Sequence, residues 1–183
     1  MTRVELIDAA QAPLPARPYY GEDGSASPLT RSLAQVPELL EVALPFVSRV
    51  LGETSIDART KELVILRVSA RSGCRYCVDT HTVAAWDAGL TSEETDGLCG
   101  TPVGLSGREA ALVAWCDALC DAPAPISDEA VEHLRAHFAE HEIVELTLVA
   151  GATLMLNRFC TALELPTSPA TLARLAAERP VPR

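Results

Sequence analysis

Helix-starting signals recur along this chain and divide it into segments of helical length. A Ser, Thr or Asp can accept a hydrogen bond from the first turn of a helix, and a Glu three residues later completes a capping box. Such signals occur at Asp57, Thr91 with Glu94, Ser106 with Glu109, Ser127 and Ser168. No segment shows the sustained apolar–polar alternation and β-branched content of a strand. We therefore predict an all-α fold, a single-domain bundle of antiparallel helices joined by short loops.

Apolar periodicity, with the positions of proline and glycine, sets the expected bounds of these helices. We expect them over 31–51, 57–72, 74–89, 91–97, 106–120, 127–138, 142–163 and 168–179. Pro37 suits a first turn, whereas Pro45 should kink or divide the first segment. Gly73 and Gly89 should end the second and the third.

Length, composition and net charge limit the classes of protein to which this chain can belong. A chain of 183 residues fits one domain, and because 48% are apolar but only 4% aromatic, Ala, Leu and Val must fill its core. The net charge of −10 argues against a nucleic-acid partner. The first residues lack the basic start and apolar centre of a secretory signal, and the apolar run 146–156 is too short for a bilayer. We expect a cytoplasmic protein with no membrane partner.

Residues 1–31 differ from the rest in composition. Four prolines and two glycines lie there, and because proline fixes φ and removes a donor we expect an extended N-terminal arm with little helix. The helical domain then covers 32–183. The arm is either a disordered tail, or apolar residues such as Leu6, Leu14 and Tyr20 anchor it on its own body or on a neighbouring subunit.

The stretch 57–89 carries the strongest candidates for chemistry. It holds Glu62, then Cys74 and Cys77 in a C-x-x-C, then His81. In a helix the positions i, i+3 and i+7 fall on one face. The two thiols and the imidazole are therefore expected to share one stripe.

Glu62 should point at least partly inward. Its neighbours on the helical wheel are mostly apolar, and Arg67 and Arg71 lie on the opposite side, where we expect solvent. A carboxylate is seldom buried without a partner. Glu62 either forms a structural ion pair, for example with Arg158, or orients the imidazole of His81.

The two cysteines are placed for redox chemistry. A helix N-terminus lowers a thiol pKa, and a C-x-x-C arrangement lowers it further. The thiolate can attack a peroxide oxygen or a disulfide sulfur, and a neighbouring thiol can then condense with the sulfenic acid to form a disulfide. His81, four residues after Cys77, is within reach to accept or relay its proton. Nucleophile, base and orienting group are thereby all present.

A structural zinc site in a non-enzymatic scaffold is the main alternative. Cys74, Cys77 and His81 would supply three ligands, and the fourth would have to be Glu62. Zinc-binding cysteine pairs usually lie in knuckle turns rather than along a helix. Haem attachment needs C-x-x-C-H, which Val78 rules out.

The spacing E-x11-C-x2-C-x3-H formed by these residues resembles the core of the AhpD-like alkylhydroperoxidases, within the carboxymuconolactone decarboxylase superfamily. The resemblance is strong over 37–90, and LMLNRFCTALEL, with its Asn-Arg pair, is similar to a later core helix. It implies an all-helical homo-oligomer (dimer, trimer or hexamer) without an organic cofactor. It also implies that Cys77 is peroxidatic and Cys74 resolving, with Glu62 and His81 as the proton relay.

One position departs from the family, because well-studied members carry a histidine where this chain has Tyr76. The resemblance therefore does not extend to an auxiliary relay there. Family members regenerate a peroxiredoxin and are reduced through lipoyl-protein electron transfer, whereas the decarboxylase branch generally lacks the cysteine pair. The resemblance thus implies a thiol-dependent peroxidase for small hydroperoxides, with a thiol, lipoyl-protein or peroxiredoxin partner. The alternatives are the metal-binding or oligomeric scaffold, and a member recruited to another reaction such as decarboxylation.

The remaining cysteines and most histidines fit structural roles. Cys116, Cys120 and Cys160 lie on apolar helix segments and are expected to be core residues. Cys99 is expected in a loop. Three histidines recur every four residues over 133–141, which indicates a solvated or interface stripe rather than a metal site.

Overall fold

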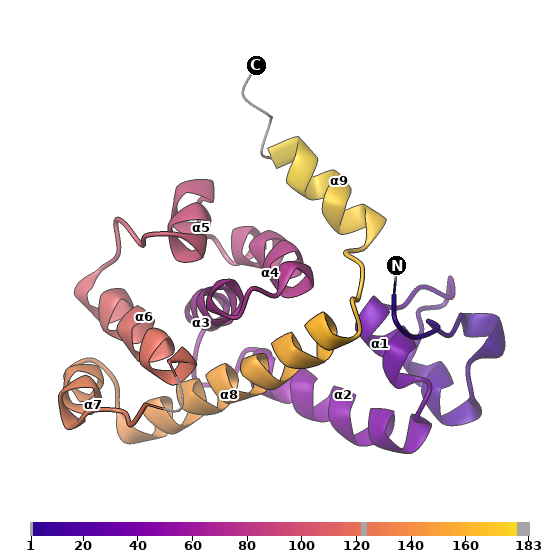
Figure 1. Ribbon diagram of the computed structural model, residues 1–183, viewed down its shortest axis with the longest axis horizontal. Coiled ribbons are helices and arrows are strands. Elements are labelled where there is room, and N and C mark those ends of the chain that lie inside the picture. Colours follow the sequence, from indigo (N-terminus) through magenta and orange to yellow (C-terminus); the bar gives the residue numbers. More distant parts are fainter. Residues whose placement is uncertain (1, 122–123, 179–183) are drawn as a thin grey trace.

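Helices and short turns make up the computed structural model in the ranges that it describes, residues 2–121 and 124–178. The predicted all-α fold is confirmed, and Figure 1 shows the helices gathered around α3, with no strand in these ranges. The elements are the 3-10 helices η1 (Ala9–Gln11) and η2 (Leu14–Tyr19), followed by α1 (Pro28–Leu33), α2 (Pro37–Leu51), α3 (Ala58–Arg71), α4 (Arg75–Asp87), α5 (Ser92–Cys99), α6 (Gly107–Cys120), α7 (Asp128–Arg135), α8 (Glu140–Ala162) and α9 (Pro169–Glu178).

The signals that start and end the helices form the predicted interactions. The side chain of Asp57 accepts a hydrogen bond from the backbone N–H of Thr60 at 2.9 Å. Both predicted capping boxes close, at the start of α5 and at the start of α6. Gly73, after α3, has a φ of 67°, a left-handed conformation that glycine adopts without a Cβ clash. These bounds are therefore set by local sequence.

The first predicted helix is divided, but not at Pro45. α1 ends at Leu33, and α2 begins at Pro37, the first-turn position expected for that proline. Val36 has φ −134° and ψ 76°, because a residue before proline is kept out of the helical region. Pro45 lies inside α2, which continues through it and packs on α8.

α3 is the central helix. It packs against α4, α5, α6 and α8, and residues 63–69 are all buried. The expectation that Arg67 faces solvent is therefore wrong. Its guanidinium donates two hydrogen bonds to the carboxylate of Asp117, at 2.7 and 2.8 Å, and others to the carbonyls of Leu98 and Gly100. A helix covered on all sides has no solvent face, so its charged side chains need partners inside the fold.

The N-terminal arm packs on its own chain. The backbone N–H of Arg3 donates to the carbonyl of Leu163 at 3.0 Å, and that of Ile7 donates to the carbonyl of Arg31 at 3.1 Å. The disordered-tail alternative therefore does not hold for the described part of the arm. It is also less extended than predicted, because η1 and η2 lie within it and the φ that proline imposes suits a tight helix.

α8 is, by length and composition, long and apolar enough to cross a membrane. The uninterrupted apolar run 146–156 is shorter than this helix, so the run alone does not reveal the apolar length of α8. Core helices of globular proteins meet the same criterion, and α8 packs against α2, α3, α4 and α6. Burial in the core explains only part of the apolar composition of α8. In its apolar 18-residue stretch 39% is buried, whereas Leu148 and Met155 of α8 are exposed.

Candidate active site

Glu62 and His81 meet where α3 packs on α4. Nδ1 of His81 lies 2.9 Å from Oε2 of Glu62, and the two side chains are 21% and 14% exposed. The prediction that Glu62 points inward is confirmed, and its partner is this imidazole rather than the guanidinium of Arg158. A carboxylate placed here orients the ring and favours the tautomer with its proton on Nδ1, which leaves Nε2 as a proton acceptor.

Cys74 and Cys77 lie at the start of α4, as predicted. Cys74 is the N-cap residue, Cys77 is in the first turn, and both are buried thiols. Their Sγ atoms are 2.8 Å apart, which is about 0.8 Å more than the length of a disulfide bond. A small movement is therefore enough to join the two sulfurs.

A third thiol, Cys160 of α8, belongs to the same cluster. It is buried and packs with Cys74, Cys77 and Leu165. Cys160 was predicted to be a core residue, a small apolar side chain. That assignment missed its sulfur neighbours, because it lies far from them in sequence and no local pattern connects them.

The three neighbouring thiols shift one another's pKa values. The neighbouring Cys160 and Cys77 thiols lower the pKa of the Cys74 thiol to about 3. The Cys160 and Cys74 thiols, together with burial, raise the pKa of Cys77. The Cys74 thiol raises the pKa of Cys160 to about 12. Cys74 therefore ionises more readily than Cys77, which must lose a proton before it can attack.

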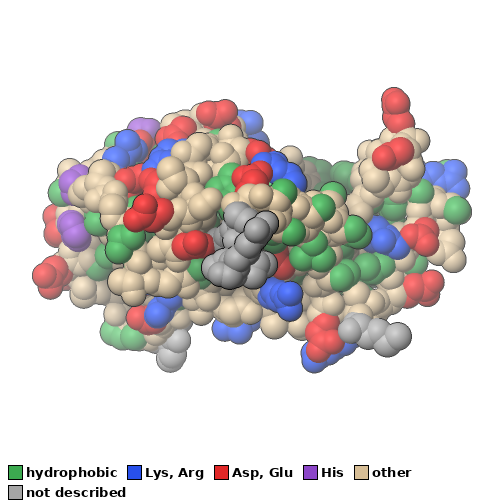
Figure 2. Space-filling view, turned by 90° about the horizontal axis from the view of Figure 1, so that it is seen from above, with side chains coloured by type: hydrophobic (Ala, Val, Ile, Leu, Met, Phe, Trp, Pro, Cys, Tyr) green, Lys and Arg blue, Asp and Glu red, His purple; other side chains and the backbone are tan. Residues whose placement is uncertain are grey.

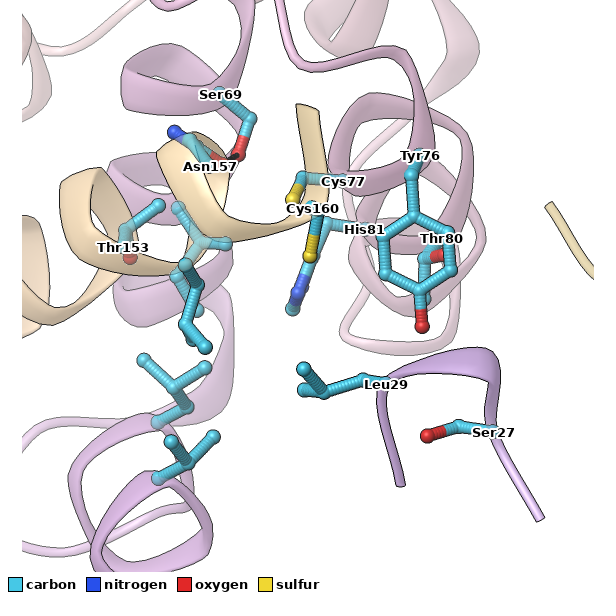
Figure 3. A pocket seen from close by; sticks show the side chains of 14 residues that line it. Ser27, Leu29, Ser69, Tyr76, Cys77, Thr80, His81, Thr153, Asn157 and Cys160 are labelled. Carbon is cyan, nitrogen blue, oxygen red and sulfur yellow. Dashed lines mark hydrogen bonds between the residues drawn. The ribbon is translucent and has the colours of Figure 1, made fainter. Parts of the chain in front are cut away.

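A cavity of about 210 Å³ opens beside Cys77, Cys160 and His81. Figure 3 shows the two sulfurs close to the imidazole, with Tyr76 on one side and Leu29 of α1 facing them. Burial raises the pKa of Tyr76 to about 12, so its phenol stays neutral. The volume is below the usual range for drug-sized ligands, and the cavity therefore suits a small substrate.

A polar group on another wall of this cavity went unpredicted as a site residue. Asn157 of α8 is buried, and its Oδ1 lies 3.1 Å from Oγ of Ser69, which donates to it. Its Nδ2 has no hydrogen-bond partner among the residues that the structure describes. Buried donors are normally satisfied, so this amide is a candidate for contact with a ligand oxygen. The Asn-Arg pair in LMLNRFCTALEL was the available signal.

The other candidates lie outside this site. Cys116 is buried in the main core, as predicted, and burial raises the pKa of its thiol. The rings of His133 and His137 are 6.0 Å apart, and Figure 2 shows histidines gathered at one end of a face on which acidic and basic side chains are interspersed. Over residues 2–121 and 124–178, no group of three or more His, Cys, Asp or Glu side chains is arranged to hold a metal ion.

Glu62, the C-x-x-C and His81 lie within the range that matches a known protein family. Residues 37–118 match the carboxymuconolactone decarboxylase family. An uncharacterized protein of Mycobacterium tuberculosis is 37% identical over 107 residues, which cover 57% of this chain and 36% of that protein. An alkyl hydroperoxide reductase of the same species is 36% identical over 93 residues, which cover 49% of this chain and 27% of the reductase. The chain spans about a third or less of the length of these two relatives.

Solved structures share the fold over most of the chain. An AhpD-type protein of unknown function from Agrobacterium tumefaciens has a TM-score of 0.70 and 27% identity, covering 75% of this chain and 95% of its own. A peroxidase-related protein of Ralstonia eutropha JMP134 has a TM-score of 0.86 and 16% identity, covering 98% of both chains. The debrominase Bmp8 has a TM-score of 0.79 and 18% identity, covering 98% of this chain and 99% of its own. The last two likenesses concern the fold alone.

Proposed function

Because this chain is an AhpD-like member of the carboxymuconolactone decarboxylase superfamily, we propose that it is a thiol-dependent peroxidase that reduces small hydroperoxides. The observation that carries the proposal is a pair of thiols 2.8 Å apart, one of which lines a small cavity with a carboxylate-bound histidine. The relative described as an alkyl hydroperoxide reductase supports it.

Cys77 is the peroxidatic thiol in this proposal, because it lines the cavity together with His81 and Cys74 does not. The imidazole, oriented by Glu62, accepts the Cys77 proton. The Cys77 thiolate attacks one peroxide oxygen, the O–O bond breaks, and the other oxygen leaves as an alcohol carrying the proton from His81. Cys77 is then a sulfenic acid.

Cys74 resolves the sulfenic acid. It ionises more readily than Cys77, since the neighbouring thiols lower its pKa. Attack on the Cys77 sulfur displaces hydroxide, which is protonated to water, and leaves the Cys74–Cys77 disulfide. An external thiol, either a lipoyl protein or another protein dithiol, then reduces that bond, and a peroxiredoxin is a candidate partner. We place this cycle in the cytoplasm, where other thiols are kept reduced.

We also propose that the chain is a homo-oligomer. Leu39, Val42 and Phe46 of α2 are 62%, 70% and 42% exposed, and they lie with Met155 of α8 along an apolar groove of about 360 Å³. A contiguous apolar surface of this kind is a common mark of a protein interface. A second copy of this chain placed there would border the site, because Leu29 lines both the groove and the active-site cavity.

Thiol counting tests the peroxidase proposal. Protein exposed to one equivalent of cumene hydroperoxide should lose two thiols, and dithiothreitol should restore them. Cys77→Ser should abolish this loss, whereas Cys116→Ser, a buried cysteine of the main core, should behave like the parent. If Cys77→Ser protein consumes hydroperoxide at the parental rate, the proposal fails.

A further inference from the structure

Cys160 faces two cavities, whereas each cysteine of the C-x-x-C faces one of them. The cavity of about 210 Å³ is lined by Cys77, Cys160 and His81. A separate cavity of about 170 Å³ is lined by Cys74, Cys160 and Thr161. Of the three clustered sulfurs, Cys160 is thus the one that borders both the space beside the histidine and the space beside the thiolate.

The surroundings of Cys160 also differ from those of a cysteine that only fills space. Cys116 has leucine, valine and tryptophan side chains in the cluster around it. Cys160 instead packs with two other thiols, Cys74 and Cys77, in one buried cluster. Thiols packed in one cluster can form a disulfide when a side-chain movement brings the two sulfurs to bonding distance.

We propose that Cys160 is a third redox thiol of this site, which condenses with the Cys77 sulfenic acid and then passes the disulfide to Cys74. The proposal rests on the proposed peroxidase function and deepens it. It gives Cys77 two resolving partners in place of one. It also moves the disulfide from the cavity where hydroperoxide reacts to the second cavity, where an external dithiol can reduce it.

Each step balances in atoms and electrons. The Cys77 sulfenic acid and the Cys160 thiol form an S–S bond and release water, so the two electrons given to the hydroperoxide come from these two sulfurs. The Cys74 thiolate then attacks the Cys160 sulfur, the Cys77–Cys160 bond breaks, and Cys77 leaves as a thiolate that takes up a proton. This exchange is redox-neutral. An external dithiol reduces the Cys74–Cys160 disulfide and is itself oxidised to a disulfide.

A Cys74→Ser variant separates this route from a two-cysteine cycle. If Cys74 were the only resolving thiol, the variant would lose one thiol per equivalent of hydroperoxide and hold a sulfenic acid that dimedone labels. With Cys160 as a second resolving thiol, the variant should still lose two thiols. Its dimedone labelling should be at least tenfold lower than that of the same variant with Cys160→Ser added. Adding Cys160→Ser should restore labelling of Cys77, whereas adding Cys116→Ser should not.

Tryptic digestion under non-reducing conditions identifies the bond directly. Cleavage at arginine places Cys74 in peptide 72–75, Cys77 in 76–108 and Cys160 in 159–174. Peptide 76–108 also contains Cys99, so every variant in this experiment carries Cys99→Ser. Mass spectrometry of the oxidised Cys74→Ser protein should show 76–108 joined to 159–174.

The outcomes distinguish this proposal from the underlying function. A parent protein that loses two thiols, together with a Cys74→Ser variant that loses one and shows no linked peptide, would overturn the role of Cys160 and leave the peroxidase intact. A parent that loses none would refute the peroxidase itself. Should the variant fail to fold, the parent quenched with N-ethylmaleimide during oxidation serves instead. Peptide 159–174 joined to another cysteine peptide is then expected, and its absence contradicts the proposal.

Discussion

Replacing Glu62 by Gln should slow oxidation of Cys77 without unfolding the protein. The two side chains are nearly equal in size, so Gln keeps an oxygen near Nδ1 of His81 and removes only the charge. The carboxylate is 2.9 Å from the ring, and both partners are largely shielded from solvent. A hydrogen bond to a charged group contributes about 1.5–3 kcal/mol. At about 1.4 kcal/mol per decade, the loss corresponds to a rate about 10- to 150-fold lower.

The assay is the single-turnover loss of thiols after mixing with excess hydroperoxide, which does not depend on any external reductant. Asp79→Asn is the matched control. Asp79 is on α4 with His81, its side chain is 19% exposed, and it accepts a hydrogen bond from Thr167 at 2.6 Å away from the relay. The control should oxidise at the parental rate. An unchanged rate in Glu62→Gln, or an equal fall in both variants, would refute the relay reasoning.

Three further predictions concern stability, pH and assembly. Arg67→Met removes both guanidinium hydrogen bonds to Asp117, leaving Arg71 at 3.4 Å as its remaining cation, and should lower the free energy of unfolding by about 1.5–3 kcal/mol, measured in urea. A hydrogen bond from Arg59 lowers the pKa of Glu94 to about 2, from an unperturbed 4.5. Its contribution to stability is therefore complete above about pH 4.5 and is lost as pH falls through about 2, so the destabilisation by Glu94→Gln should shrink over that window. Phe46→Asp, on the exposed apolar groove, should reduce the mass measured by sedimentation.

Each of these has an outcome that contradicts it. A loss under 1 kcal/mol for Arg67→Met would mean that its pair behaves like an exposed one, such as Arg135 with Glu132, which is the control. A Glu94→Gln effect that stays constant from pH 6 to pH 2 would exclude the ionised Glu94 as its source. A parent that sediments as a monomer, or a Phe46→Asp variant with the parental mass, would remove the groove as an interface.

The local part of the site could be read from sequence, because its parts lie within one helix or two consecutive helices. The cap at Asp57 and the break at Gly73 set the bounds of α3, and they give Glu62 and the C-x-x-C their register. The turn between α3 and α4 is short, so an inward carboxylate on one helix and an imidazole on the next were expected to meet. Their separation of 2.9 Å agrees with that expectation.

The predictions that the structure did not bear out concern packing between segments that are far apart in the chain. Arg67 was expected in solvent because a helical wheel does not reveal that α6 covers the opposite side of α3. Cys160 was assigned to the core because its sequence neighbours on α8 are apolar. Nothing in that local sequence indicates that the two thiols at the start of α4 pack against it. Leu29 lies in the segment predicted as an extended arm, and nothing in the sequence indicated that it lines the active-site cavity.

The sequence by itself determined that this chain is helical, where most helices begin, and that two thiols, an imidazole and a carboxylate share one region. Those properties follow from hydrogen bonds and side-chain periodicity within a few turns. Only the tertiary structure decided that a third sulfur joins the pair, that the pKa of Cys74 is lowered while that of Cys77 is raised, and that the arm closes one wall of the cavity. Contacts between residues far apart in the chain carry no local signature, because they arise from the packing of whole helices.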